Sequence, residues 1–323
     1  MSQLTVDPTP GIELTPEASP KPRPNRHGTL AVALALAVCL ALALGAGAPV
    51  YVAFRNAGYD IFRSYEYYKL VRSTENMVVR TSTNFELRMD KSDAGWASMV
   101  LNTAEQAAAT EATDLGLDIQ QVRAQQGGRR VLLVMYPTKE ALSSSFGWPA
   151  GENALGAYWA GAIRLLSPTS WLGDMPSQRV TYVYRKDGPV AHELAHMLFD
   201  YASKGNYPRW FTEGAAEYEE WKANGFLWIE GDGREVLQSR YTLDQLEDFD
   251  SLDDQALAYR QSLLMVAFIK EKAGPDGLKG LSLDLGRRPS FWQVVKERTG
   301  LDRQNFEAAF AAWLPKNIDR WSN

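Results

Sequence analysis

The longest uniform stretch of the chain is an apolar run from Thr29 to Phe54, which contains no charged residue and is rich in Leu, Ala and Val. A bilayer-spanning helix needs about 20 such residues, so residues 29–54 predict a transmembrane anchor. A cleaved signal peptide is the alternative, because Ala46-Gly47-Ala48 resembles a cleavage site. Pro49 directly after this triplet and the long tail before the run favour an uncleaved anchor.

The residues before this run set its expected orientation. Residues 1–28 are rich in proline and show no hydrophobic periodicity, which predicts a disordered tail. Lys21, Arg23 and Arg26 precede the run and would hold the tail in the cytoplasm, although arginines also follow the run. We therefore expect a single-pass membrane protein whose larger part is extracytoplasmic.

Patterns typical of strands come next. Residues 55–75 are polar and rich in aromatics, and we expect them to form a stalk. Residues 84–89 alternate polar and apolar side chains like a half-buried strand, and the unbroken apolar run 131–136 predicts a buried strand. Further extended segments are expected at 161–167 and 179–184, and an alanine-rich helix at 94–115. Residues 76–187 thus predict a sheet-bearing N-terminal lobe.

Helical periodicity dominates beyond Asp187. Apolar residues recur at helical spacing in five segments, namely 188–202, 210–223, 253–273, 289–299 and 302–314. Residues 188–323 therefore predict a first helix followed by a helical C-terminal lobe. The expected fold class is α+β, with the sheet in the front half and the helices in the back half.

Composition narrows the chemistry. A hydrophobic content of 45% supports a buried core, and a net charge of -5 lacks the basic excess of a nucleic-acid-binding surface, so no nucleic-acid partner is expected. The single cysteine, Cys39, lies in the apolar run, which excludes disulfides and cysteine ligands elsewhere. The only histidines are His27, His192 and His196, so carboxylates must complete any metal site.

Residues 192–196 read His-Glu-Leu-Ala-His, an HExxH sequence. Asp187 as N-cap and Pro189 in the first turn predict a helix that starts just before it. His192 and His196 would share one helical face and reach one ion, while Glu193, about 100° round, would touch bound water without being a ligand. The alternative is an ordinary amphipathic turn. With three histidines in 323 residues, chance placement has a probability on the order of 10⁻³.

A catalytic zinc takes three protein ligands and leaves one position to water, so a third ligand is needed. His27 precedes the membrane run, and Phe199 and Ala202 occupy the positions where a metzincin has Gly and His. Downstream, Pro208 opens the segment PRWFTEGAAEY, in which two glutamates at positions 213 and 217 share one helical face. A solvated acidic face is the alternative interpretation of this pair.

Together, HELAH and PRWFTEGAAEY resemble the gluzincin zinc metallopeptidases, in particular the peptidase MA-like family, and are similar to the corresponding helices of thermolysin and the aminopeptidases. The resemblance implies a zincin-like fold with one Zn²⁺ held by His192, His196 and Glu213. It also implies that Glu217 orients His192 through its free ring nitrogen. The 16 residues between His196 and Glu213 are slightly fewer than in those enzymes.

The expected reaction is hydrolysis of a peptide or protein substrate, in which zinc lowers the pKa of its bound water and Glu193 takes the proton. The resemblance suggests Tyr259 as a donor to the oxyanion, and a packed helix residue is the competing interpretation. Segment 160–167, expected along the substrate cleft, carries no carboxylate to hold a free amino terminus, which favours an endopeptidase. The alternative function is an inactive membrane-tethered binding domain, against which Glu193 argues, because structural zinc needs no base.

Overall fold

The computed structural model describes residues 47–111, 114–148, 154–173, 175–227 and 233–321. They belong to one compact unit that extends from Ala46 to Asn323. The predicted tail and most of the predicted anchor lie outside the described residues. Among the residues described, no helix is both long and apolar enough to cross a bilayer.

One five-stranded mixed sheet lies in the front half, with strand order β1-β2-β3-β5-β4. The strands are β1 (Val78–Thr81), β2 (Phe85–Met89), β3 (Val131–Tyr136), β4 (Gly156–Trp159) and β5 (Ala162–Leu166). Strands β2, β3 and β5 run parallel, whereas β1 and β4 are antiparallel edge strands. All residues of β3 and β5 are buried, which explains the unbroken apolar run of β3. The predicted strands at 84–89, 131–136 and 161–167 are confirmed.

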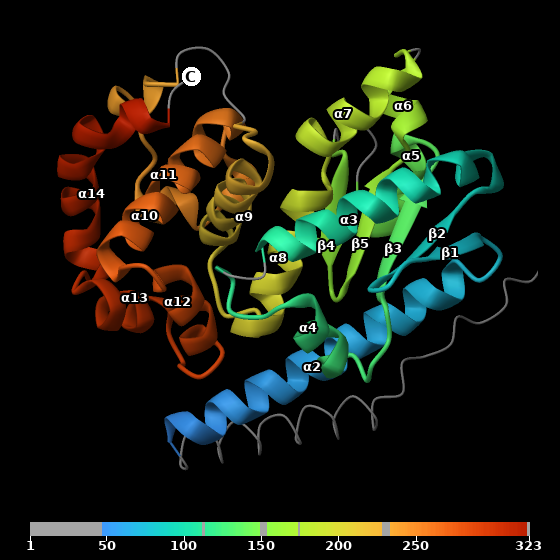
Figure 1. Cartoon of the computed structure of the whole chain (residues 1–323). Coiled ribbons are helices and arrows are strands. Elements are labelled where there is room, and N and C mark those ends of the chain that lie inside the picture. The colour runs from blue at the N-terminus through green and yellow to red at the C-terminus, as the bar shows by residue number, and fades with distance from the viewer. Residues whose placement is uncertain (1–46, 112–113, 149–153, 174, 228–232, 322–323) are drawn as a thin grey trace, which may run out of the picture. The chain divides into compact units, whose positions relative to one another are not determined.

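Helices surround the sheet and form the back half (Figure 1). Their bounds are α2 (Ala48–Ser73), α3 (Ala97–Glu111), α4 (Ile119–Gln125), α5 (Lys139–Phe146), α6 (Pro168–Leu172), α7 (Ser177–Asp187), α8 (Val190–Ser203), α9 (Arg209–Asn224), α10 (Leu243–Leu246), α11 (Gln255–Ala273), α12 (Gly277–Leu285), α13 (Phe291–Thr299) and α14 (Arg303–Asn317). The five helical segments expected beyond residue 187 are confirmed as α8, α9, α11, α13 and α14. The α+β class is therefore confirmed.

Alternate residues of β3 serve two hydrophobic clusters. Leu133 and Met135 face the larger cluster, which includes residues of α3, α8, α9 and α11. Leu132 and Val134 face the smaller one, which includes Leu70 of α2 and residues of α5. The sheet is therefore covered on both faces, and α8 lies between the sheet and the helical back half, in contact with β4, β5 and α9.

Two local predictions before α8 are wrong. Residues 179–184 form part of helix α7 rather than a strand, because Val180 and Tyr184 are both buried and lie one helical turn apart. Asp187 does not cap α8, since it ends α7, and Pro189 occupies the N-cap of α8 without a side-chain hydrogen bond.

Helices α9 and α11 pack very closely at Gly214. A Cβ atom at this position would lie 2.2 Å from the backbone oxygen of Ser262 in α11. Only glycine allows this approach, so the glycine that follows Glu213 serves helix packing. The close contact holds α9, and with it Glu213, against the back half of the molecule.

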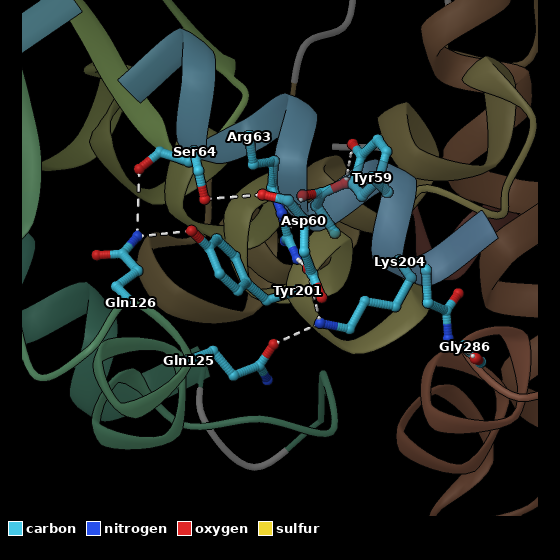
Figure 2. Close-up of polar contacts among 12 residues, drawn as sticks. Tyr59, Asp60, Arg63, Ser64, Gln125, Gln126, Tyr201, Lys204 and Gly286 are labelled. Carbon is cyan, nitrogen blue, oxygen red and sulfur yellow. Dashed lines mark hydrogen bonds and ion pairs between the residues drawn. The ribbon is translucent and has the colours of Figure 1, made fainter. Parts of the chain in front are cut away.

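The segment expected to form a stalk is helix α2, and this helix packs against the rest of the unit. Arg63 and Leu70 of α2 are buried. Figure 2 shows side chains of α2 facing α8 and the loop after α4, including the ion pair between Asp60 and Lys204, whose atoms are 3.1 Å apart. The Arg63 guanidinium also lies over the ring of Tyr201, 3.9 Å from its centre. Residues 55–73 thus belong to the folded unit.

Candidate metal centre

Helix α8 presents its two histidines on one face, as its spacing predicts. Leu194 and Leu198 are fully buried on other sides of the helix. The Nε2 atoms of His192 and His196 lie 3.1 Å apart. Two imidazole nitrogens at this separation are close enough to bind one ion.

Glu213 of α9 completes a triangle with the two imidazoles. Its Oε2 atom lies 3.4 Å from Nε2 of His192 and 3.3 Å from Nε2 of His196. Its other oxygen, Oε1, accepts from Nε of Arg209 at 2.9 Å, one helical turn earlier. The structure therefore brings together the three residues predicted as ligands, and His192, His196 and Glu213 could hold a metal ion.

The second nitrogen of each imidazole also has a partner. Nδ1 of His196 lies 2.8 Å from Oγ1 of Thr212. Nδ1 of His192 lies 3.3 Å from Oε2 of Glu220 but 3.9 Å from Oε1 of Glu217. The residue nearer to this nitrogen is therefore Glu220 rather than the predicted Glu217.

Thr212 and Glu220 are thus site residues that the sequence interpretation missed. Glu220 follows Glu213 by seven positions, and this spacing returns a residue to nearly the same helical face. Glu217 and Glu220 also form, with His192, a second group that could hold a metal ion. This group shares the His192 ring with the first, so both belong to one centre.

Burial and charge act against each other at these ligands. Burial alone would lower the pKa of His192, but the hydrogen bonds to Glu213 and Glu220 raise it well above its usual value. Burial alone would raise the pKa of Glu213, but the two imidazoles and Arg209 hold it well below its usual range. Glu213 is therefore ionised at neutral pH, as a ligand must be.

Glu193 lies between α8 and the edge strand β4. Its Oε2 atom accepts a hydrogen bond of 2.6 Å from the backbone N–H of Tyr158. The Glu193 side chain is buried, and burial raises its pKa. The strand beside the site is β4, at the edge of the sheet. The segment 160–167, which we expected along the cleft, mostly forms β5, and β5 lies inside the sheet. Strand β4 carries no carboxylate either.

Tyr259 of α11 also lies beside the centre. Its ring centre is 6.5 Å from that of His192. Burial is the largest cause that raises the pKa of Tyr259 well above its usual value, and the charge of Glu213 is the next. The hydroxyl therefore remains protonated and able to donate. Arg209 is a hydrogen-bond partner of this hydroxyl. The structure thus brings Tyr259 to the site, while its predicted role stays a prediction.

A buried carboxylate at the far end of α8 connects the site to α2. Asp200 is fully buried, and its Oδ1 accepts from the hydroxyls of Tyr59 and Tyr207 at 2.6 and 3.0 Å. Its Oδ2 accepts from the Tyr158 hydroxyl at 2.6 Å and from Nη1 of Arg63 at 3.1 Å. The residue whose backbone holds Glu193 is therefore fixed by its side chain to α8 and, through Asp200, to α2.

Comparison with models of known protein families gave no match, and comparison with curated proteins gave no significant match.

Proposed function

We propose that this chain is a zinc-dependent metallopeptidase of the gluzincin class, similar to the peptidase MA-like family, with a zincin-like catalytic domain. The observation that carries the proposal is the triangle formed by the donor atoms of His192, His196 and Glu213, whose edges measure 3.1, 3.3 and 3.4 Å. A tetrahedral zinc ion with bonds of about 2.0–2.1 Å needs ligand atoms about 3.3–3.4 Å apart. The donor set, two imidazoles and one carboxylate, also suits catalytic zinc.

A base beside three protein ligands supports a catalytic site over a structural one. When bound, zinc supplies Lewis-acid polarisation of the substrate carbonyl and makes water a stronger nucleophile. Glu193, held by the N–H of Tyr158, accepts a proton from the attacking water and passes it to the leaving amine. Tyr259 donates its hydroxyl hydrogen bond to the oxygen that gains negative charge.

The position of β4 supports an extended peptide as the substrate. An edge strand has one side free of strand partners and can add a peptide as a further strand. Because β4 and β5 carry no carboxylate to hold a free amino terminus, we favour an endopeptidase. The uncharged run 29–54 supports a membrane tether, and the basic residues before it favour an extracytoplasmic catalytic domain.

Metal analysis and an activity assay together test this function. We expect the purified chain to contain one zinc ion, to cleave casein and amino-terminally blocked peptides, and to lose both properties after chelation. Glu213→Ala should lower zinc content to background, because two imidazoles alone hold zinc weakly. Zinc retained by this variant would contradict the ligand set, and zinc without any cleavage would favour the inactive binding domain.

A matched pair of substitutions on α9 tests which glutamate orients His192. Glu220→Gln should weaken zinc binding about 10–100-fold, because the carboxylate nearest to Nδ1 fixes the tautomer and raises ligand basicity. Glu217→Gln should weaken it less, since its oxygen is farther from this nitrogen. Competition with a fluorescent chelator measures both affinities. The reverse order would restore Glu217 as the orienting residue.

A further inference from the structure

Helix α2 has a second face, which is exposed and aromatic. Of the ten large hydrophobic side chains that are exposed in the described part of the chain, six lie on this helix: Tyr51, Phe54, Ile61, Phe62, Tyr65 and Tyr68. Most of these residues follow one another at intervals of three, four or seven positions, which return to the same side of a helix. They therefore form one stripe along α2. A seventh, Trp159, contacts the ring of Phe62 edge-on, with centres 5.9 Å apart.

Such a stripe is unusual on the surface of a folded unit. Single exposed hydrophobic residues need no explanation, but a contiguous patch marks a surface that contacts something apolar. Helix α2 does not span a bilayer, because Arg55, Asp60, Arg63, Glu66 and Lys69 interrupt it. Its exposed large hydrophobic residues are mainly Tyr and Phe. Aromatic side chains, above all those with a polar atom, favour the boundary between lipid headgroups and hydrocarbon.

The beginning of α2 indicates what covers this face. The helix begins at Ala48, inside the uncharged run 29–54, so the sequence has no polar linker between that run and the helix. If the run enters a bilayer, the first turn of α2 must stay at the bilayer surface. We propose that the exposed face of α2 lies on the lipid bilayer at headgroup depth. This inference rests on the predicted anchor and is independent of the zinc chemistry.

The opposite face of α2 gives this docking a consequence for the candidate metal centre. Tyr59 and Arg63 bind Asp200 of α8, the helix that carries both histidines. Figure 2 also shows Asp60 of α2 in polar contact with Lys204, the residue directly after α8. A membrane contact through the exposed face therefore fixes the orientation of the metal centre relative to the bilayer.

A pair of labelled variants of the full chain tests the proposal. In a Cys39→Ala background, Tyr65→Cys places an environment-sensitive fluorophore on the stripe, and Tyr182→Cys places it on α7. The two tyrosines are matched controls, since they are 65% and 66% exposed. Figure 1 shows α7 and α2 at opposite ends of the described unit. Ile61→Cys, at a position 71% exposed, is a second probe of the stripe if the Tyr65 variant does not fold.

We expect the label at position 65 to shift its emission to the blue in phosphatidylcholine–phosphatidylglycerol vesicles. Lipids with a headgroup-level quencher should quench it several-fold more than the label at 182. Equal quenching at both positions, or no association with vesicles, would overturn the proposal. Shielding of the label at position 65 in detergent would also overturn the proposal. Shielding that depends on protein concentration would indicate a second copy of the chain, and shielding that does not would indicate another part of the same chain. Zinc content, measured on the same samples, reports separately on the metal centre.

Discussion

Replacing Glu193 with Gln is expected to abolish peptide hydrolysis while zinc content stays at the wild-type level. The amide has the shape of the carboxylate and still accepts the hydrogen bond from Tyr158, but it cannot take a proton from water. Glu193 is also outside the triangle of donor atoms. Loss of a general base costs about 10²–10⁴-fold in rate. Initial rates on a fluorogenic peptide and zinc analysis of the same preparation measure both effects.

Glu213→Gln serves as the matched control, because the same chemical change at a ligand should remove zinc and activity together. Full activity in Glu193→Gln would exclude Glu193 as the base. Loss of zinc in that variant would instead make Glu193 a ligand, although it belongs to neither group of residues that could hold a metal ion.

The histidine pair could be predicted from the sequence because its geometry is local. Residues four apart on a helix always share a face, so His192 and His196 needed only a helix to converge. Glu213 followed from the need for a third ligand and from the resemblance of its segment. Its approach to the histidines, however, depends on how α9 crosses α8, which no sequence pattern specifies.

The same dependence on packing explains what the sequence did not reveal at the site. Glu217 and Glu220 lie on almost the same face of α9, and the rotation of this helix against α8 decides which carboxylate is nearer to His192. Strand β4 has four residues and no alternation in burial, so it gave no signal of its own. Its place at the sheet edge comes from pairing with β5.

Helix α2 was mistaken for a stalk because its contacts are long-range. A short buried stripe, marked by Val52, Arg63 and Leu70, includes a charged residue that looks solvent-exposed in the sequence. Its partner Asp200 lies 137 positions away along the chain. Ion pairs between such distant residues leave no periodic pattern in the sequence. The burial of Arg63 and of Asp200 could therefore not be predicted.

The largest effect on stability is expected from Asp200→Ala, which should lower the free energy of unfolding by about 3–5 kcal/mol. The change removes the buried carboxylate that pairs with the Arg63 guanidinium and leaves Arg63 only the half-exposed carboxylate of Asp60. Removing one partner of a buried pair costs this much. Burial and the charge of Asp200 raise the pKa of Tyr59, Tyr158 and Tyr207, so three protonated hydroxyls also lose their acceptor. Urea unfolding followed by circular dichroism measures the change.

Two further variants separate the charge from the other contacts of Asp200. Asp319→Asn removes an exposed aspartate from a surface pair with Arg234 and should change stability by less than about 1 kcal/mol. In the double variant Asp200→Ala/Arg63→Met, the buried charge that lost its Asp200 partner is gone, so the loss should be smaller than the sum of the single losses. Additive losses would mean that this pair is not coupled, and that the loss in Asp200→Ala comes from the other contacts of Asp200, such as the hydroxyl of Tyr59.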